Sequence, residues 1–231
     1  MSTFGVVVNP TSGRGRGARV GARAMSELRG RGHEVLDLSR GSAEEARAAA
    51  KQAVAHGIDA LVVVGGDGIV NLGVNVLAET GIPLGIVAAG TGNDIARELG
   101  LPRHDVPRAV DAIERGLAAE PRFIDLVSVG PPGFAATTWY AGVLSCGFDA
   151  AVNARANRMR WPRGALKYWI AILAELGAYR PYGYKMTSDD ATWESSGTLV
   201  AVGNASQFGG GIRITPDARL DPDQVALELL K

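Results

Sequence analysis

Three glycine-rich turns, each placed directly after a short apolar run, are the feature that most constrains the fold of this chain. The turns are NPTSGRGRG (residues 9–17), GGDG (65–68) and AAGTGND (88–94). The runs FGVVV, LVVV and PLGIVA precede them and are typical of buried strands, and a helical pattern follows each turn. Strands that alternate with helices predict a parallel sheet with helices on both faces.

The alternation extends over the first half of the chain. Ser42 is a candidate helix cap, because its oxygen can accept a backbone N–H and because Glu44 and Glu45 follow at the positive end of the helix. We expect strands at 4–8, 34–38, 61–64 and 83–88, and helices at 16–29, 43–55, from the GGDG turn to 79, at 93–99 and at 106–115.

The pattern changes from about Phe123 onward. Segments 122–130, 137–148 and 197–205 look like antiparallel strands, and 153–179 has helical character. The sequence therefore predicts an α/β domain at 1–122, three-layered around a parallel sheet, and a β-rich, sandwich-like domain at 123–231. Ligands of open α/β sheets bind at the carboxyl ends of the strands, where all three glycine-rich turns fall.

Bulk properties exclude several classes of protein. Of the 231 residues, 46% are apolar, which is enough for a proper core, and the formal net charge is zero, so no overall field favours nucleic acid. Cys146 is the only cysteine, and the three histidines lack metal-ligand spacing. Residues 168–179 form the longest apolar candidate, contain Glu175 and are too short to span a bilayer. We expect a soluble cytoplasmic protein.

The GGDG turn combines backbone amides with one carboxylate. Glycines let backbone N–H groups approach a ligand and form an anion nest, and the following helix adds partial positive charge. A carboxylate there repels phosphate unless a divalent cation or a transferable proton is present, which suggests a metal-linked or hydroxyl-activating role for Asp67. The alternative is an aspartate that only caps the next helix.

The other two turns offer further donors. Thr11, Ser12 and the glycines of NPTSGRGRG supply hydroxyl and amide groups, and Arg14 and Arg16 could reach phosphate. This turn has neither the Walker A nor the dinucleotide-binding spacing, and it could be a solvated surface turn. In AAGTGND, Asp94 falls in the first turn of a helix, where the dipole favours a carboxylate, so a plain helix start is the alternative there.

The combination of these motifs resembles one family. NPxSG, GGDG and AxGTGNDxAR, together with FGGGIRITPDARLD (208–221), are similar to the diacylglycerol kinase catalytic domain family, which includes bacterial lipid kinases and the sphingosine and ceramide kinases and is related to the NAD kinases. The likeness runs from residue 4 to about residue 221. It implies an ATP-binding α/β domain, a β-rich second domain, and transfer of the γ-phosphate of ATP, with Mg²⁺, to the hydroxyl of diacylglycerol or a similar lipid.

The resemblance also implies site residues. The catalytic set would be Asp67, Asp94 and Asp221, and the metal ligands would be Asp221 and Asp223. The residues around ATP would be Asn9, Pro10, Thr11, Ser12, Gly13, Ser39, Gly65, Gly66, Asp67, Gly68, Asn71, Gly90, Thr91, Gly92 and Asn93.

The sequence departs from the family pattern at several positions. The family usually has Thr and Glu where this chain has Ile69 and Leu72, and Pro222 stands where an acidic Mg²⁺ ligand is expected. The chain stops at Lys231, before a late DGE segment of the family whose glutamate is a proposed base. A nucleotide- or lipid-binding homologue with impaired catalysis is therefore one alternative, and an NAD kinase, against which GTGNDIAR speaks, is another.

Residues 153–185 combine cations with aromatic side chains. Such a segment suits peripheral contact with the inner face of a membrane, where a lipid kinase meets its substrate, and no recognition motif for nucleic acid accompanies it. The alternative is an amphipathic helix packed on the second domain, and a homodimer is left open. The residues concerned are Arg155, Arg158, Arg160, Trp161, Arg163, Lys167, Tyr168, Trp169, Tyr179, Arg180, Tyr182, Tyr184 and Lys185.

Overall fold

The first half of the chain forms a parallel sheet. The computed structural model describes residues 1–119, 121–131, 135, 138–159, 161–162, 165–178, 180–187, 191–220 and 226–230. The four strands of the sheet are parallel and lie in the order β2-β1-β3-β4. Their bounds are β1 (Thr3–Val8), β2 (Glu34–Asp37), β3 (Ala60–Gly65) and β4 (Leu84–Ala88).

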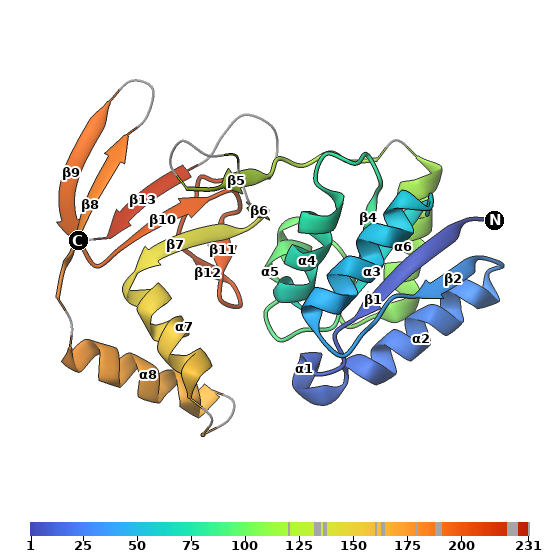
Figure 1. Cartoon of the computed structure of the whole chain (residues 1–231), viewed down its shortest axis with the longest axis horizontal. Helices are drawn as coiled ribbons and strands as arrows, with labels where there is room; N and C mark the ends of the chain where they lie inside the picture. Colours follow the sequence, from blue (N-terminus) through green and yellow to red (C-terminus); the bar gives the residue numbers. More distant parts are fainter. Residues whose placement is uncertain are drawn as a thin grey trace.

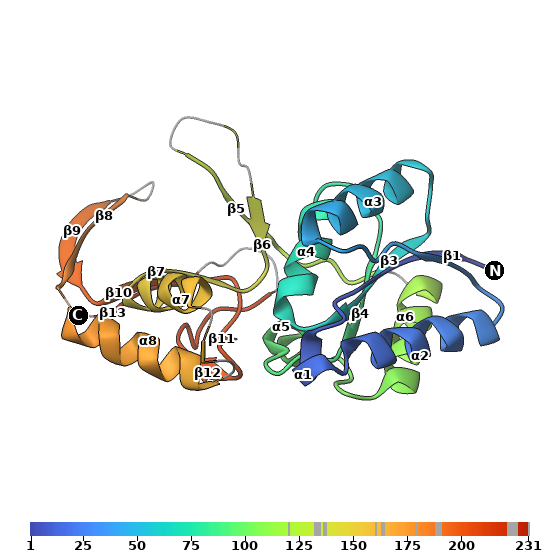
Figure 2. The same cartoon turned by 60° about the horizontal axis from the view of Figure 1, so that its bottom comes forward.

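Helices cover both faces of this sheet. They are α1 (Ser12–Gly15), α2 (Gly17–Gly30), α3 (Ala43–Ala55), α4 (Asp67–Leu77), α5 (Asp94–Glu98) and α6 (Val106–Ala118). In Figure 2 the sheet lies between α3 and α4 on one side and α2 and α6 on the other. Side chains alternate accordingly: Leu61 and Val63 of β3 pack toward α3 and α4, whereas Val62 and Val64 pack toward α2 and α6. The predicted three-layer domain is confirmed.

A local signal in the sequence explains the start of α3. The Ser42 side chain accepts the backbone N–H of Glu45, and the Glu45 carboxylate accepts the Ser42 N–H, so the cap of α3 is a capping box. The sequence did not predict α1, a single turn in which Gly13 and Arg14 have positive φ angles of 56° and 62°.

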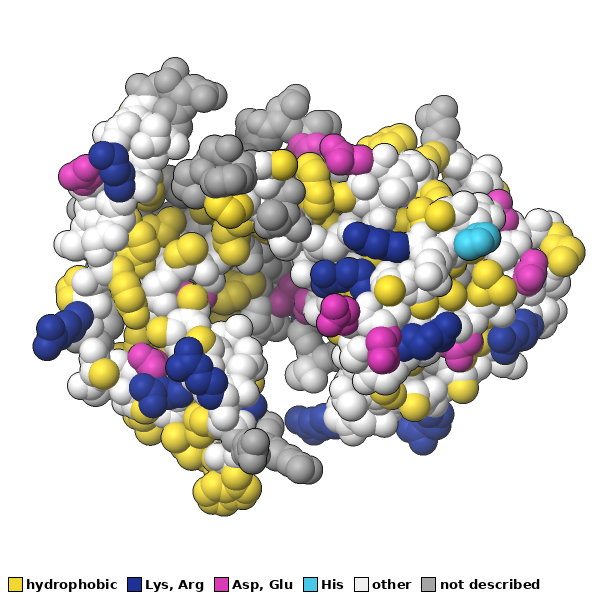
Figure 3. All heavy atoms as spheres, viewed as in Figure 1, with side chains coloured by type: hydrophobic (Ala, Val, Ile, Leu, Met, Phe, Trp, Pro, Cys, Tyr) yellow, Lys and Arg dark blue, Asp and Glu magenta, His cyan; other side chains and the backbone are white. Residues whose placement is uncertain are grey.

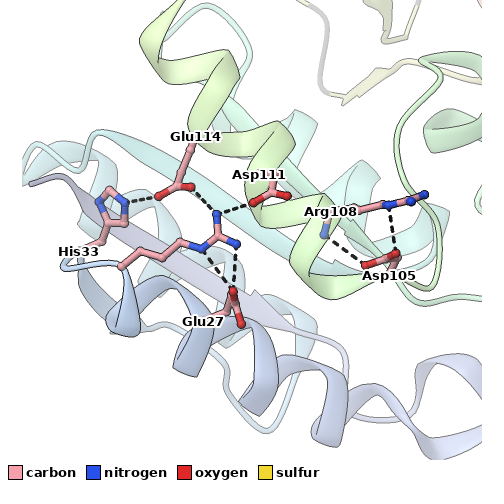
Figure 4. A network of polar contacts seen from close by, with 7 residues as sticks. Glu27, His33, Asp105, Arg108, Asp111 and Glu114 are labelled. Carbon is pink, nitrogen blue, oxygen red and sulfur yellow. Dashed lines mark hydrogen bonds and ion pairs between the residues drawn. The ribbon is translucent and has the colours of Figure 1, made fainter.

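A network around Arg31 joins α2 to α6. The Arg31 guanidinium, at the end of α2, contacts Glu27 of the same helix. It also contacts two residues of α6, Asp111 at 2.6 Å and Glu114 at 2.5 Å (Figure 4). Glu114 also contacts the His33 ring at 2.8 Å. The hydrogen bonds that Arg31 donates to Glu27, Asp111 and Glu114 raise the pKa of Arg31. The hydrogen bond with His33, followed by that with Arg31, lowers the pKa of Glu114.

The second half is built from antiparallel strands and two helices. A three-stranded sheet has the order β13-β10-β7, and the pairs β5–β6, β8–β9 and β11–β12 are hairpins or ribbons. The strands are β5 (Val127–Val129), β6 (Thr138–Tyr140), β7 (Val143–Gly147), β8 (Tyr182–Thr187), β9 (Thr192–Gly197), β10 (Leu199–Gly203), β11 (Gln207–Phe208), β12 (Ile212–Arg213) and β13 (Ala226–Leu230).

The helical segment expected at 153–179 is two helices, α7 (Phe148–Arg158) and α8 (Ala165–Gly177), with Trp161 and Pro162 outside both. In Figure 1 the two halves form separate lobes, with the N-terminus on one and β13 on the other. The β5–β6 ribbon lies between the lobes and rests on α4, where Asn75 bonds the backbone of Trp139 through both amide atoms, at 2.9 and 2.8 Å. The domain boundary between residues 122 and 123 stays a prediction.

Candidate active site

Two of the glycine-rich turns touch through their backbones. The register pairs Gly65 with Ala88, so the GGDG and AAGTGND turns leave the sheet side by side. A Cβ atom on Gly90 would lie 2.4 Å from the Cα of Gly66, well inside van der Waals contact. Gly65 O also accepts the N–H groups of Ala89 and Gly90 at 2.8 and 3.1 Å. Only glycine at position 90 permits this approach.

The first turn packs on the same two segments. A Cβ on Gly13 would lie 2.3 Å from the carbonyl oxygen of Ala89, and a Cβ on Gly65 would lie 3.3 Å from the Cβ of Asn9. The backbone N–H of Asn9 donates to Val64 O at 3.0 Å. The three turns that the sequence places at one sheet edge therefore form one continuous surface.

Asn93 holds the third turn closed. It is 2% exposed, adopts the left-handed conformation with φ 57°, and precedes α5. Its Oδ1 accepts the Gly90 N–H at 2.8 Å and its Nδ2 donates to Gly90 O at 2.9 Å. Asn93 therefore shapes the turn, and its side-chain amide is already occupied by Gly90.

Asp67 lies where the turns meet. Its Oδ1 accepts the Ile95 N–H at 3.1 Å, which ties the first residue of α4 to α5. Its Oδ2 lies 3.0 Å from the position of a Cβ on Gly92, and no hydrogen bond to this oxygen is found among the described residues. The partly buried carboxylate thus keeps one oxygen available beside the glycine backbone.

Asp94 has both carboxylate oxygens engaged. Arg97 forms an ion pair with Oδ1, and the backbone N–H of Gly210 donates to Oδ2 at 2.7 Å. Arg97 also donates to Gly92 O at 3.0 Å. Since Gly210 belongs to the second lobe, Asp94 links the two lobes, and Asp67 is the freer of the two acids.

The expected nucleotide residues of the first turn form local contacts. Asn9 Oδ1 accepts the Thr11 N–H at 3.1 Å and the Thr11 hydroxyl at 2.9 Å, while Pro10 is exposed. Ser39, at the end of β2, accepts the Val8 N–H at 3.0 Å, so it lies next to this turn. Ser12 Oγ is buried and finds no hydrogen-bond partner in the described part of the chain, and it faces the region of Gly65 and Gly17.

The remaining expected residues surround the same turns. Gly68 is exposed, Asn71 accepts from Asn75 through its backbone oxygen at 2.8 Å, and Thr91 is exposed. A pocket of about 190 Å³ is lined by Gly13, Arg14, Arg16, Gly90, Thr91 and His104. The first and third turns thus share a hollow bordered by cations.

The expected metal ligands Asp221 and Asp223, and Pro222 between them, lie outside the described residues. Within the described ranges, no three His, Cys, Asp or Glu side chains gather as a metal cluster. Asp67 Oδ2 nevertheless fits Mg²⁺, because this ion commonly takes one or two protein carboxylates and completes its shell with phosphate oxygens and water. The predicted site residues and their roles stay predictions.

The two positions of α4 at which the sequence departs from the family pattern lie in the hydrophobic core. Ile69 is 8% exposed and Leu72 is 4% exposed, and both pack in the cluster beneath α3 and α4. Ile69 also contacts the backbone region of Gly65. Ile69 therefore supports the turn from inside, and Leu72 belongs to the core of the first lobe.

Several residues at this edge carry interactions that the sequence did not single out. Glu98 accepts Ser206 Oγ at 2.8 Å and Gln207 Nε2 at 3.2 Å, and Arg97 lies next to Gly211. Arg97 bonds Asp94 and Gly92 within the first lobe, whereas the partners of Glu98 come from the second lobe. One amino-acid sequence carries no local pattern that predicts such contacts between distant residues.

Models of two protein domains match this chain. The model of the diacylglycerol kinase catalytic domain matches residues 3–129, and that of the YegS C-terminal NAD kinase beta sandwich-like domain matches 142–226. The chain belongs to the diacylglycerol kinase catalytic domain family.

Similar relatives carry related names. A diacylglycerol kinase of Mycobacterium tuberculosis is 42% identical over 92% of this chain and 68% of its own length. A diacylglycerol kinase of Bacillus subtilis is 28% identical over 100% of this chain and 74% of its own. A probable YegS-like lipid kinase of Stenotrophomonas maltophilia is 29% identical over 86% and 64%. These names indicate an enzyme of the kinase type.

A solved structure supports the fold. A diacylglycerol kinase of Bacillus anthracis superposes with a TM-score of 0.68, at 24% identity, over 100% of this chain and 73% of that one. The predicted class, a parallel α/β domain followed by a β-sandwich-like domain, is therefore confirmed.

Proposed function

We propose that this chain transfers the γ-phosphate of ATP to the hydroxyl of diacylglycerol or a similar lipid alcohol, with Mg²⁺ as cofactor. The observation that carries the proposal is the backbone contact between Gly66 and Gly90, with Asp67 beside it. Backbone amides at such turns can hold phosphate without a lysine. Family membership supplies the reaction class, since relatives are named diacylglycerol kinase and lipid kinase.

Each part of the site has a role in this proposal. Phosphoryl transfer depends mainly on positioning and on neutralising charge, which the glycine amides and the start of α4 provide. Bound Mg²⁺ would neutralise the charge that develops on the phosphate oxygens. Asp67 Oδ2 accepts the proton of the acceptor hydroxyl, while Asp67 Oδ1 stays fixed by the Ile95 N–H.

The acceptor class is supported by the surface of α8. Leu166, Trp169, Leu173 and Leu176 recur at helical spacing and are 55–68% exposed, while Ala171 packs against α7. Trp161, which precedes α8, is 80% exposed. Figure 3 shows hydrophobic side chains at the lower end of this lobe. Helix α8 therefore packs on α7 through one side, and its apolar stripe is open to solvent.

We propose that this apolar stripe rests on the inner face of a membrane, which brings the lipid to a cytoplasmic enzyme. Tryptophan and tyrosine side chains with nearby cations such as Lys167 favour the membrane interface. Within the described ranges, no helix is both long and apolar enough to cross a bilayer. Arg160, Arg163 and Tyr179 of the same segment lie outside the described residues.

An acceptor panel tests the reaction class. The protein is incubated with γ-labelled ATP and Mg²⁺ in micelles that contain diacylglycerol, a sphingoid base or no lipid, and separately with NAD. Label in the lipid extract supports the proposal, whereas label in NAD alone would establish an NAD kinase. ATP binding without transfer to any acceptor would instead indicate the homologue with impaired catalysis.

A further inference from the structure

A basic pocket lies behind the glycine-rich turns, between α2 and the start of α6. Its volume is about 250 Å³, and its lining includes Val87 and Ala88 at the end of β4 and the adjacent Ala89. Figure 2 shows α2 and α6 next to one another on this face of the sheet. The charged or ionisable residues in its lining are Arg16, Arg19, Arg23, His104 and Asp105.

The three arginines form one row on α2. Arg16 is the N-cap residue, and Arg19 and Arg23 follow at helical spacing, with Val20 between them in the same wall. All three are exposed. Within the described part of the chain, no acidic side chain forms an ion pair with any of them.

This placement contradicts two local preferences of helices. The macrodipole favours acids near a helix N-terminus, yet the first turn of α2 has none, and Arg16 and Arg19 stand there instead. Like charges four residues apart, such as Arg19 and Arg23, also repel. No acidic residue occurs from Asn9 to Ser26. Helix stability therefore does not account for this row, whereas a bound anion would.

The carboxylate in the lining does not neutralise the arginines. Asp105 caps α6 by accepting the Arg108 N–H at 3.2 Å, and its other oxygen lies 3.6 Å from Arg108 Nε. His104 is held with φ 60° by its N–H bond to Ala88 O at 2.9 Å. The start of α6 adds partial positive charge to the same wall.

We propose that this pocket binds an anion that carries more than one phosphate group. Guanidinium groups match phosphate oxygens in a planar fork, and seven residues of helix spread three of them over about 10 Å. A single small anion would contact only part of this row. Arg19 and Arg23 do not line the neighbouring hollow of Gly13 and Thr91, so the site is separable from the glycine-rich turns.

Two probes distinguish the sources of such phosphate groups. Inorganic pyrophosphate, titrated calorimetrically without ATP or lipid, represents a soluble ligand. Phosphatidylcholine vesicles with and without phosphatidic acid, in a flotation assay, represent clustered lipid headgroups. Neither measurement requires kinase activity, so failure of the proposed reaction and failure of this site remain distinguishable.

Two double variants distinguish the loss of the arginine row from the loss of two positive charges elsewhere. Arg19→Gln with Arg23→Gln removes two cations from the pocket and keeps most of each side chain. Arg47→Gln with Arg115→Gln removes two exposed helix cations elsewhere and serves as the control. Thermal unfolding of both variants establishes that the fold is retained.

We expect the pocket variant to bind pyrophosphate about 10-fold more weakly than the control, because two charge-assisted contacts are lost. If only binding to phosphatidic acid vesicles falls, the phosphate groups are those of lipids. If pyrophosphate binds only at the glycine-rich turns, the pocket substitutions will not change the affinity for pyrophosphate. The proposal is overturned if both variants bind both probes equally well, or if the wild type binds neither.

Discussion

Gly90 shows how a single residue fixes the geometry of the candidate site. The space between Gly90 and Gly66 has no room for a side chain, and Asn93 holds the same residue through two hydrogen bonds. Gly68, in the neighbouring turn, has open space around the position of a Cβ. A side chain can therefore be added at Gly68 without a clash, but not at Gly90.

Gly90→Ala is expected to lower the free energy of unfolding by about 1–3 kcal/mol, because the new methyl group must push backbone apart. It should also weaken ATP binding, since the turn is displaced. Gly68→Ala is the matched control and should leave the melting temperature within a degree or so of the wild type. Calorimetric unfolding of the three proteins measures this, and equal effects of both substitutions would contradict the assigned contact.

The sequence predicted which residue types gather at this edge, but not their partners. Glycine spacing and strand order were sufficient to bring the turns together. The pairing of Asp94 with Gly210 and of Glu98 with Ser206 depends on how the second lobe docks, which no local pattern encodes. The place of Asn93 near ATP stays a prediction, and the closure of its own turn by its buried amide was not predicted.

At the scale of elements, the strands and helices of the first lobe follow the predicted order, because their hydrophobic periods are clear. The segment 153–179 was predicted less well, as two helices replace one. Pro162 between them was the signal for the break, since proline disfavours a helix interior. The Arg31 network was not predicted, because its partners come from α2 and from the distant α6.

The link between α2 and α6 should depend on pH. The hydrogen bond from His33, and then Arg31, holds the pKa of Glu114 below its usual value of 4.5. A carboxylate with a depressed pKa stabilises the fold above its unfolded pKa, and the contribution is lost as the pH falls through its folded pKa. The difference in free energy of unfolding between the wild type and Glu114→Gln should therefore shrink below about pH 4.5. Urea unfolding across this range measures it, and a constant difference would refute the link.

The apolar stripe of α8 makes a separate prediction. Trp169→Ser with Leu173→Ser should weaken binding to lipid vesicles about 10-fold, because two side chains no longer enter the interface. Both residues are exposed, so the melting temperature should change little. Phe123→Ser with Leu36→Ser, two exposed apolar residues elsewhere, is the control. Equal vesicle binding by all three proteins would remove α8 as the docking surface.

At the scale of the whole molecule, the β11–β12 region of the second lobe is fastened to α5 of the first. Asp94 accepts the Gly210 N–H, and Glu98 accepts from Ser206 and Gln207. Figure 3 shows a notch between the lobes that opens on the lower side. These contacts place the second lobe beside Asp67, where the proposed acceptor would approach.

Glu98→Ala is expected to loosen this connection, because two hydrogen bonds to a carboxylate are lost, at a cost of about 1–2 kcal/mol. Amides of residues 206–213 should then exchange hydrogen faster, while those of β1 and β3 stay protected. Glu44→Ala, on the exposed face of α3, is the control. Unchanged exchange at 206–213 in Glu98→Ala would show that the lobes are joined by other contacts.

In the proposed reaction, Asp67 of the glycine-rich surface serves phosphoryl transfer to a lipid hydroxyl. Asp67→Asn preserves the oxygen that accepts the Ile95 N–H, so the fold and ATP binding should be retained. Its loss of basicity should slow transfer about 100-fold or more. Asp59→Asn, which alters an acid at the opposite end of β3, is the control.

The direct measurement is the initial rate at which label from γ-labelled ATP enters diacylglycerol in Mg²⁺-containing micelles, for the wild type, Asp67→Asn and Asp59→Asn in parallel. The predicted result is transfer by the wild type and by Asp59→Asn, and little by a folded, ATP-binding Asp67→Asn. Equal transfer by Asp67→Asn and the wild type, or no transfer by a wild-type protein that binds ATP, would contradict it.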